Sequence, residues 1–272
     1  MLSQANERLR RVTSPQNALV KDLRRAFAHG ERTPDGYCAI ESVRIIEEAI
    51  RSGLRFRGIF FSESAENRAE RLLPQIASHV DSVLLTDEVF RSAVATETPQ
   101  GVAALVKLRE FDLDDALNVS SGLFVGIAGI QDPGNLGTII RSAEAFGANA
   151  VLLGEKTVSQ FNPKVVRAAA GSLFRLKIIN TPLASAIHRL RTSGVRLIGT
   201  SSHNGKPLNE VELTGPLALF VGNEGTGMPR EVLAEMDQNV IIPHSSRVES
   251  LNAGVAASIL LYEASRQRDK AV

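Results

Sequence analysis

Three short segments in the second half of the chain combine glycine with polar side chains, each directly after an apolar run. The first contains Asn135 and Arg141, the second contains Glu224, and the third contains Ser250 and Asn252. An arginine can bind a phosphate or stabilise a developing negative charge, and the amide, hydroxyl and carboxylate groups can position it by hydrogen bonding. These five residues are therefore the candidates for the chemistry of an active site.

The second segment is rich in glycine. Gly222, Gly225 and Gly227 follow an apolar run, with Asn223 and Glu224 among them. Because glycine adopts positive φ angles and lets a ligand approach the backbone closely, this loop is predicted to bind a ligand rather than only to turn the chain. It lacks the Lys-Ser/Thr pair of a phosphate-binding P-loop, which disfavours that class of site.

The first and third segments each precede a predicted helix. Asn135 is expected to cap the first helix and Ser250 the last one, with Asn252 in its first turn and free to point at a ligand. Arg141 follows Asn135 by six residues, a net helical rotation of about 240°, so the two side chains are not stacked on one face. Read one at a time, these segments are also compatible with capped helices that have no further role.

The elements that position these segments are six apolar runs, which predict the strands of a mostly parallel sheet. They cover residues 122–130, 149–154, 174–180, 195–201, 217–223 and 239–243. Near-continuous apolar strands are typical of a parallel sheet with helices on both faces. Ligands bind beyond the carboxyl ends of such strands, which is where the three segments lie.

The first half of the chain alternates shorter helices and strands, beginning with a predicted helix over residues 15–29. The alternation indicates a small α/β domain over residues 1–108. Residues 109–121 are acidic and polar, which is typical of a linker, although part of this stretch is compatible with a short helix. Residues 122–272 then form the second domain.

The composition is ordinary for a globular protein and excludes several classes. The 272 residues are 43% hydrophobic and 22% charged, and no apolar run is long enough to span a membrane. The single cysteine, Cys38, excludes an internal disulfide, and the five histidines lack metal-ligand spacing, so no metal site is expected. We expect a cytoplasmic protein, and we interpret the start, residues 1–12, as a native terminus rather than a transit peptide.

Charge is nearly balanced overall but unevenly distributed. The chain has 31 lysines and arginines against 30 aspartates and glutamates. Residues 1–32 contain seven basic and three acidic residues, while Arg51, Arg55 and Arg57 occupy a stretch without any acid. Such patches can bind phosphates, and scattered charge on solvated helix faces is the alternative interpretation.

Taken together, the three segments resemble the SpoU/TrmH family of RNA ribose 2′-O-methyltransferases, within the SPOUT superfamily. The matching motifs are N-x-G-x-x-x-R at Asn135, Gly137 and Arg141, G-N-E-G at 222–225, and S-L-N at 250–252. The resemblance covers most of residues 122–268 and includes VVRAAAGSLFRL at 165–176. The first half resembles, more loosely, the family's N-terminal substrate-binding domain.

The resemblance implies a fold, a reaction and an assembly. The C-terminal part of the sheet would form a trefoil knot that holds S-adenosylmethionine, and the protein would be a homodimer with active sites near the subunit interface. The implied reaction transfers a methyl group from S-adenosylmethionine to a ribose 2′-hydroxyl of ribosomal or transfer RNA. A guanidinium is hard to deprotonate, so we expect Arg141 to bind phosphate or to stabilise the developing alkoxide.

The family's functional positions map onto this chain residue by residue. The catalytic group comprises Arg141, Asn135, Glu224, Ser250 and Asn252. The cofactor contacts map to backbone groups at Thr200, Gly222, Ile242 and Leu251. Arg24 and Arg25 are the RNA-binding candidates of the first domain. We expect Glu224 to pair with an arginine and to stay ionised.

The chain departs from the family pattern in two places. His244 and Ser246 stand where members commonly have Met and Gly, and Ser42 follows Glu41 where they usually have Gly. A non-catalytic RNA-binding member with an altered cofactor pocket is therefore the alternative hypothesis. A nicotinamide-dependent oxidoreductase is a third hypothesis, disfavoured because no GxGxxG fingerprint is present.

Overall fold

The computed structural model describes residues 8–94, 96–202 and 204–269, so the first seven residues of the interpreted native terminus lie outside the described residues. The chain forms two compact units. Unit 1 comprises Met1–Arg109 and Ser159–Phe174, and unit 2 comprises Glu110–Val158 and Arg175–Val272. In the described ranges, every helix is too short or too polar to cross a membrane.

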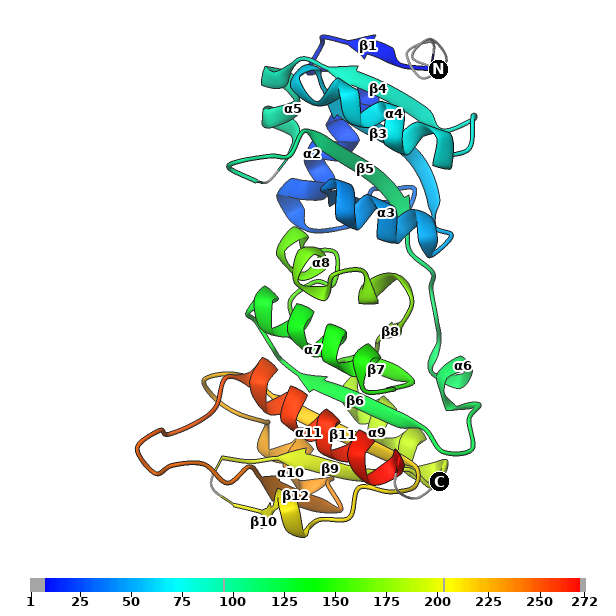
Figure 1. Ribbon diagram of the computed structural model, residues 1–272. Coiled ribbons are helices and arrows are strands. Elements are labelled where there is room, and N and C mark those ends of the chain that lie inside the picture. The colour runs from blue at the N-terminus through cyan, green and yellow to red at the C-terminus, as the bar shows by residue number, and fades with distance from the viewer. Residues whose placement is uncertain (1–7, 95, 203, 270–272) are drawn as a thin grey trace. The chain divides into compact units, whose positions relative to one another are not determined.

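Unit 1 is built on a five-stranded mixed sheet with the order β1-β4-β3-β5-β2 (Figure 1). Its strands are β1 (Arg10–Val12), β2 (Cys38–Glu41), β3 (Arg55–Ser62), β4 (Asp81–Leu85) and β5 (Val102–Lys107). Strand β5 runs antiparallel to both β3 and β2, whereas β1, β4 and β3 are parallel. The helices are α2 (Ala18–His29), α3 (Val43–Arg51), α4 (Ala69–Leu72) and α5 (Asp87–Ala93). The helix predicted over 15–29 is thus confirmed, with Asn17 as its cap.

One segment of unit 1 comes from the middle of the second half of the sequence. Helix α8 (Pro163–Ala169) packs against β2, and the Ser159 hydroxyl donates a hydrogen bond of 2.7 Å to the carbonyl oxygen of Gly30. A Cβ at Gly171 would lie 2.8 Å from the Glu48 side chain, so this contact needs glycine. The domains predicted from the sequence are contiguous and differ from the compact units at residues 159–174. The reason is that α8 packs against β2 of unit 1.

Unit 2 contains a seven-stranded sheet with the order β10-β12-β9-β11-β6-β7-β8, in which every strand pair is parallel. Its strands are β6 (Leu123–Ala128), β7 (Ala150–Leu153), β8 (Lys177–Asn180), β9 (Arg196–Thr200), β10 (Lys206–Pro207), β11 (Leu217–Gly222) and β12 (Gln238–Ile241). The parallel α/β fold and all six predicted strands are confirmed. Strand β10 was not predicted, because two residues with a proline carry no periodic signal.

Helices cover both faces of this sheet (Figure 1). They are α6 (Leu113–Leu117), α7 (Pro133–Ala145), α9 (Leu183–Thr192), α10 (Arg230–Ala234) and α11 (Ala253–Asp269). Alternate strand residues such as Phe124 and Phe220 pack against α9 and α10. On the opposite face, α7 and α11 pack against each other and against β7 and β11. The knot that the family resemblance implies stays a prediction.

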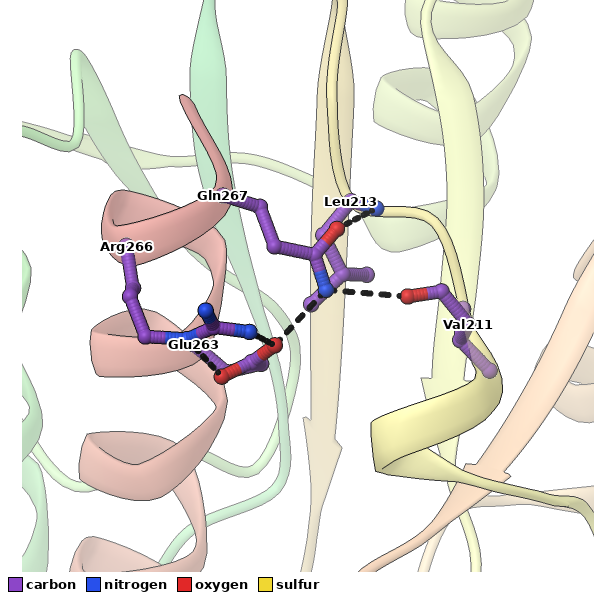
Figure 2. Close-up of polar contacts among 5 residues, drawn as sticks. All are labelled: Val211, Leu213, Glu263, Arg266 and Gln267. Carbon is purple, nitrogen blue, oxygen red and sulfur yellow. Dashed lines mark hydrogen bonds and ion pairs between the residues drawn. The ribbon is translucent and has the colours of Figure 1, made fainter. Parts of the chain in front are cut away.

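The C-terminal end of α11 is fastened to the chain that leads into β11 (Figure 2). The Gln267 side-chain oxygen accepts a hydrogen bond of 2.7 Å from the Leu213 amide, and its nitrogen donates to the Val211 carbonyl oxygen at 3.0 Å. The same nitrogen donates to Glu263 at 2.8 Å, and Glu263 also holds Arg266. The Gln267 side chain thus anchors the last helix to the loop before β11 by accepting one hydrogen bond from that loop and donating another to it.

We predict that Gln267→Ala lowers the free energy of unfolding by about 1–3 kcal/mol, because the Leu213 amide and the Val211 carbonyl lose their partner. Urea unfolding followed by circular dichroism measures the loss. Arg266→Ala is the matched control, since the Arg266 guanidinium bonds only to Glu263 among the described residues, and a smaller loss is expected. Equal losses in the two variants would contradict the anchoring role of Gln267.

Candidate active site

The first motif lies at the start of α7, at the carboxyl end of β6. Asp132 caps this helix, because its carboxylate accepts a hydrogen bond of 2.8 Å from the Asn135 amide. The prediction that Asn135 is the cap is therefore wrong. Pro133 occupies the first helical position, where its missing N–H costs nothing, and Asn135 sits in the first turn with its side chain buried. The side-chain amide group of Asn135 is therefore available for contacts with other segments.

The Asn135 side chain joins the three motifs. Its nitrogen donates a hydrogen bond of 2.9 Å to Glu224, and its oxygen accepts one of 2.8 Å from the Asn252 side-chain nitrogen. The Asn252 oxygen in turn accepts from the Val255 amide at 3.1 Å and so caps α11. An ionised carboxylate only accepts, so Glu224 fixes the orientation of the Asn135 amide, which then fixes that of Asn252. The predicted convergence of the motifs is thus built from directional hydrogen bonds.

Glu224 stays ionised through amide donors. Partial burial raises the pKa of Glu224, but hydrogen bonds from Asn135 and from the backbone amides of Glu224, Gln131 and Asp132 outweigh this effect and hold the pKa below its ordinary value. The Gln131 and Asp132 amides lie 3.4 and 3.3 Å from the carboxylate oxygens. Among the described residues, no arginine pairs with Glu224. The amide donors, and not the arginine expected from the sequence, keep this carboxylate ionised.

Asn223 organises the glycine loop and is a site residue beyond those predicted from the sequence. Its side-chain oxygen accepts from the amides of Gly225 and Thr226 at 2.9 and 3.0 Å, and its nitrogen donates to the Gly129 carbonyl oxygen at 2.8 Å. It therefore closes the loop on itself and fastens it to the segment after β6. The signal was present, since asparagine next to glycine directly after a strand is typical of a side chain that holds a turn.

A cavity of about 670 Å³ opens beside this junction in unit 2. Its lining includes all four residues predicted to bind the cofactor, namely Thr200, Gly222, Ile242 and Leu251, together with Glu224 and Ser250. A Cβ at Gly222 would collide with the backbone of Gly227 and Met228, so the loop folds back tightly on the end of β11. The size is that of small-molecule sites, which span about 300–1,000 Å³.

Ser250 and His244 both line this cavity in exposed positions. Asn252, not Ser250, caps α11, because the helix begins at Ala253 and the Asn252 side-chain oxygen accepts a hydrogen bond from the Val255 amide. A ring nitrogen of His244 lies 2.7 Å from the Ile242 carbonyl oxygen, while Ser246 is exposed. The departures at His244 and Ser246 therefore leave the cavity open.

Arg141 lies on α7 outside the residues that line the cavity. Its side chain is exposed, and it forms no hydrogen bond or ion pair with any residue that the structure describes. Its charge is consequently available to an external anion. The structure thus brings Asn135, Glu224 and Asn252 together, places Ser250 at the cavity, and leaves Arg141 apart on an exposed side of the helix.

The two arginines predicted to bind RNA have different surroundings on α2. Arg24 donates hydrogen bonds of 3.0 Å to both the carbonyl and the hydroxyl oxygen of Ser92, and a longer one to the Pro15 carbonyl oxygen. Arg25 is exposed and has no partner within the described ranges. Arg24 therefore holds α2 to α5, and Arg25 presents its charge to solvent.

We predict that Glu224→Gln reduces the loss of stability in acid. The pKa of Glu224 is lower in the folded than in the unfolded chain, so its contribution is present above its ordinary pKa of 4.5 and is lost as the pH falls through the folded pKa. The difference in unfolding free energy between wild type and variant, measured by urea titration from pH 7 to pH 3, should therefore shrink towards low pH. Glu249→Gln, at an exposed carboxylate lining the same cavity, is the control for the substitution itself and should leave the unfolding free energy at pH 7 close to that of the wild type.

Family models match both halves of the chain. The SpoU rRNA Methylase family matches residues 122–262, and the MRM3-like substrate binding domain matches residues 17–104. A 23S rRNA (guanosine(2553)-2′-O)-methyltransferase of Bacillus subtilis is 35% identical over 93% of this chain and 98% of its own. A 23S rRNA (uridine(2479)-2′-O)-methyltransferase of Streptomyces viridochromogenes is 30% identical over 95% of this chain and 93% of its own.

Solved structures agree with these matches. A SpoU methyltransferase from Streptomyces viridochromogenes, in complex with S-adenosylmethionine, has a TM-score of 0.82 at 29% identity and covers 93% of this chain and 98% of that chain. An S-adenosylmethionine-bound rRNA methyltransferase from Sinorhizobium meliloti has a TM-score of 0.83 at 28% identity, covering 95% and 98%. The chain, with its three motifs joined at Asn135, belongs to the SpoU rRNA methylase family.

Proposed function

We propose that this chain transfers a methyl group from S-adenosylmethionine to a ribose 2′-hydroxyl of ribosomal RNA. The observation that carries the proposal is the junction at Asn135, which joins the three family motifs beside a cavity of about 670 Å³. The names of the two full-length relatives support the ribose hydroxyl as the acceptor. Those names differ in the nucleotide that is modified, so the proposal is confined to the chemical class of substrate.

The cavity suits S-adenosylmethionine in its chemistry. Bare backbone at Gly222 and a hydroxyl at Thr200 offer hydrogen-bonding groups, and Ile242 and Leu251 offer apolar contact for a base or a thioether chain. We propose these four residues as the binding residues. When bound, S-adenosylmethionine supplies a methyl group on a sulfonium sulfur, which is a strong electrophile.

The residues at the junction then act by position and charge. Asn135, Glu224 and Asn252 fix the end of α7, the glycine loop and the start of α11, and Ser250 can hydrogen-bond the ribose from the cavity wall. Arg141 binds a phosphate or stabilises the oxyanion as the hydroxyl loses its proton, because its guanidinium is charged and cannot serve as the base at neutral pH.

We further propose that the working form is a homodimer in the cytoplasm. Arg141 does not line the cavity of its own subunit, and a second copy offers a way to bring it to one. Val255 and Tyr262 are large exposed apolar residues on α11, so this helix offers apolar contacts to a second copy. A ribosomal RNA substrate and one buried thiol, Cys38, fit a reducing compartment.

The two other hypotheses of the sequence analysis are not favoured. The cavity is open despite His244 and Ser246, which removes the reason to consider a non-catalytic member. Membership of the SpoU family likewise argues against a nicotinamide-dependent oxidoreductase.

We predict that Arg141→Ala lowers the rate of methyl transfer by about 100- to 1,000-fold while leaving S-adenosylmethionine affinity within about twofold, because the lost charge acts on the transition state and Arg141 is not among the residues proposed to bind the cofactor. Incorporation of labelled methyl groups into unmodified ribosomal RNA measures the rate, and calorimetric titration measures the affinity. Arg141→Lys should restore part of the rate if a point charge suffices. Normal turnover by the alanine variant would remove Arg141 from the mechanism.

We predict that Arg25→Ala and Arg24→Ala have different effects. Arg25→Ala should weaken RNA binding and reduce the slope of log affinity against log salt by about 0.7–0.9, as expected for one lost phosphate contact, without a change in stability. Arg24→Ala should instead lower the urea midpoint, because Ser92 loses its donors. Fluorescence anisotropy at several salt concentrations and urea unfolding test both variants, and an unchanged slope for Arg25→Ala would contradict its role.

A further inference from the structure

Unit 1 contains a second cavity, of about 570 Å³, at the end of the sheet where β2, β3 and β4 begin and β5 ends. Its lining includes the aromatic residues Tyr37 and Phe56 and several apolar residues, and Arg55, Arg57 and His79 supply polar groups. The remaining lining residues are Ile50, Leu54, Gln75, Ile76, Ala77 and Val80. The cavity therefore offers both an apolar surface and positive charge.

Two cations beside this cavity face each other without a counter-ion. Arg55 on β3 and Lys107 on β5 are direct partners in the antiparallel register. Neither forms a hydrogen bond or an ion pair with another residue in the described part of the chain, and both are exposed. Like charges directly opposite each other on neighbouring strands destabilise a sheet, so the fold tolerates a cost at this place. An anion bound between the two would remove that cost.

The acidic groups near the cavity are already occupied. Arg57 pairs with Asp22 at 3.3 Å and with Asp35 at 2.5 Å. Asp81, at the start of β4, pairs with Arg10 at 3.7 Å. These three carboxylates are thus held by other arginines, and the pair formed by Arg55 and Lys107 keeps its charge.

The aromatic wall is held in place before any ligand binds. Thr33 is buried and fixes the backbone of Tyr37 from both sides, accepting from the Tyr37 amide at 3.1 Å and donating to the Tyr37 carbonyl oxygen at 2.7 Å. The Lys107 ammonium lies 6.0 Å from the centre of the Tyr37 ring, so the unpaired charge and the ring adjoin. Two further lining residues, Ile76 and Ala77, are held by Arg8, which donates to their carbonyl oxygens and to that of Leu73.

We propose that this cavity binds one nucleotide of single-stranded RNA, with the base against Tyr37 and a flanking phosphate between Arg55 and Lys107. Unstacked bases bind aromatic and apolar walls, and phosphates bind unpaired cations, whereas the bases of a duplex are not available to a cavity. A volume of about 570 Å³ accommodates a nucleotide-sized ligand. The proposal rests on the proposed function, because it assigns a recognition pocket for the RNA substrate, and it concerns residues other than Arg24 and Arg25.

The test uses the full-length protein, an unstructured RNA oligonucleotide of about 12 nucleotides and fluorescence anisotropy at a series of salt concentrations. The double variant R55Q/K107Q should reduce the slope of log affinity against log salt by about 1.4, which corresponds to two single-strand charge contacts. Tyr37→Leu should weaken binding about fivefold or more and leave the slope unchanged, because it removes the ring but no charge. Arg91→Gln, which removes one charge from α5 in the same unit, is the control and should retain full affinity.

Urea unfolding shows that each variant is folded, and R55Q/K107Q should unfold at an equal or higher urea concentration, since the opposed charges are gone. Unchanged affinity and slope in the double variant would overturn the proposal. A reduced slope combined with normal binding by Tyr37→Leu would also overturn it, in favour of a charged patch without a pocket.

Methyl transfer to unmodified ribosomal RNA separates this inference from the proposed function. If the wild type transfers methyl groups and the variants keep its KM for RNA, the pocket is wrong and the proposed function stands. If the wild type binds the oligonucleotide through the pocket but transfers no methyl group, the proposed function is wrong and the pocket stands.

Discussion

The active site depends on the directionality of one amide side chain. Asn135 has one donor group and one acceptor group, and each is committed to a different segment of the chain. The donor must face Glu224 because an ionised carboxylate only accepts, so the acceptor must face Asn252. Asn252 then turns its own oxygen to the first amides of α11. One chain of hydrogen bonds, all running in the same direction, therefore fixes the relative positions of three segments: the glycine loop, the segment after β6 and the start of the last helix.

From this constraint we expect the site to tolerate changes at some residues and not at others. His244 and Ser246 lie on the cavity rim or in solvent, where a changed side chain leaves the hydrogen-bond chain intact. Asn223 is different, because its side chain holds the amides of Gly225 and Thr226 and the carbonyl of Gly129 at once. Without it, the loop that carries Glu224 would lose one of its attachments to the segment after β6, the others being the bonds from the Gln131 and Asp132 amides to Glu224.

The sequence was informative where the signal is local or periodic. Near-continuous apolar runs predicted all six longer strands of unit 2, and the glycine loop and the three motifs were placed at the carboxyl ends of the strands. The caps were mistaken at two helices, since Asp132 and Asn252 take the positions expected for Asn135 and Ser250. Several residues near a helix start can cap it equally well. Which one does depends on where the helix begins and on what a distant segment needs, as at Asn135, whose side chain bonds Glu224 and Asn252. A single sequence does not reveal that need.

The sequence likewise does not reveal which charged side chains are paired in the folded chain. Arg24 and Arg25 are adjacent and chemically identical in the sequence, yet Ser92 engages one and none of the described residues engages the other. Among Arg51, Arg55 and Arg57, the first pairs with Glu48 and the third with two aspartates, which leaves Arg55 as the cation to be explained. An exposed arginine without a partner is common and means little by itself. Arg55 differs because the register places Lys107 directly opposite it. Two like charges in this arrangement destabilise the sheet unless an anionic ligand binds between them.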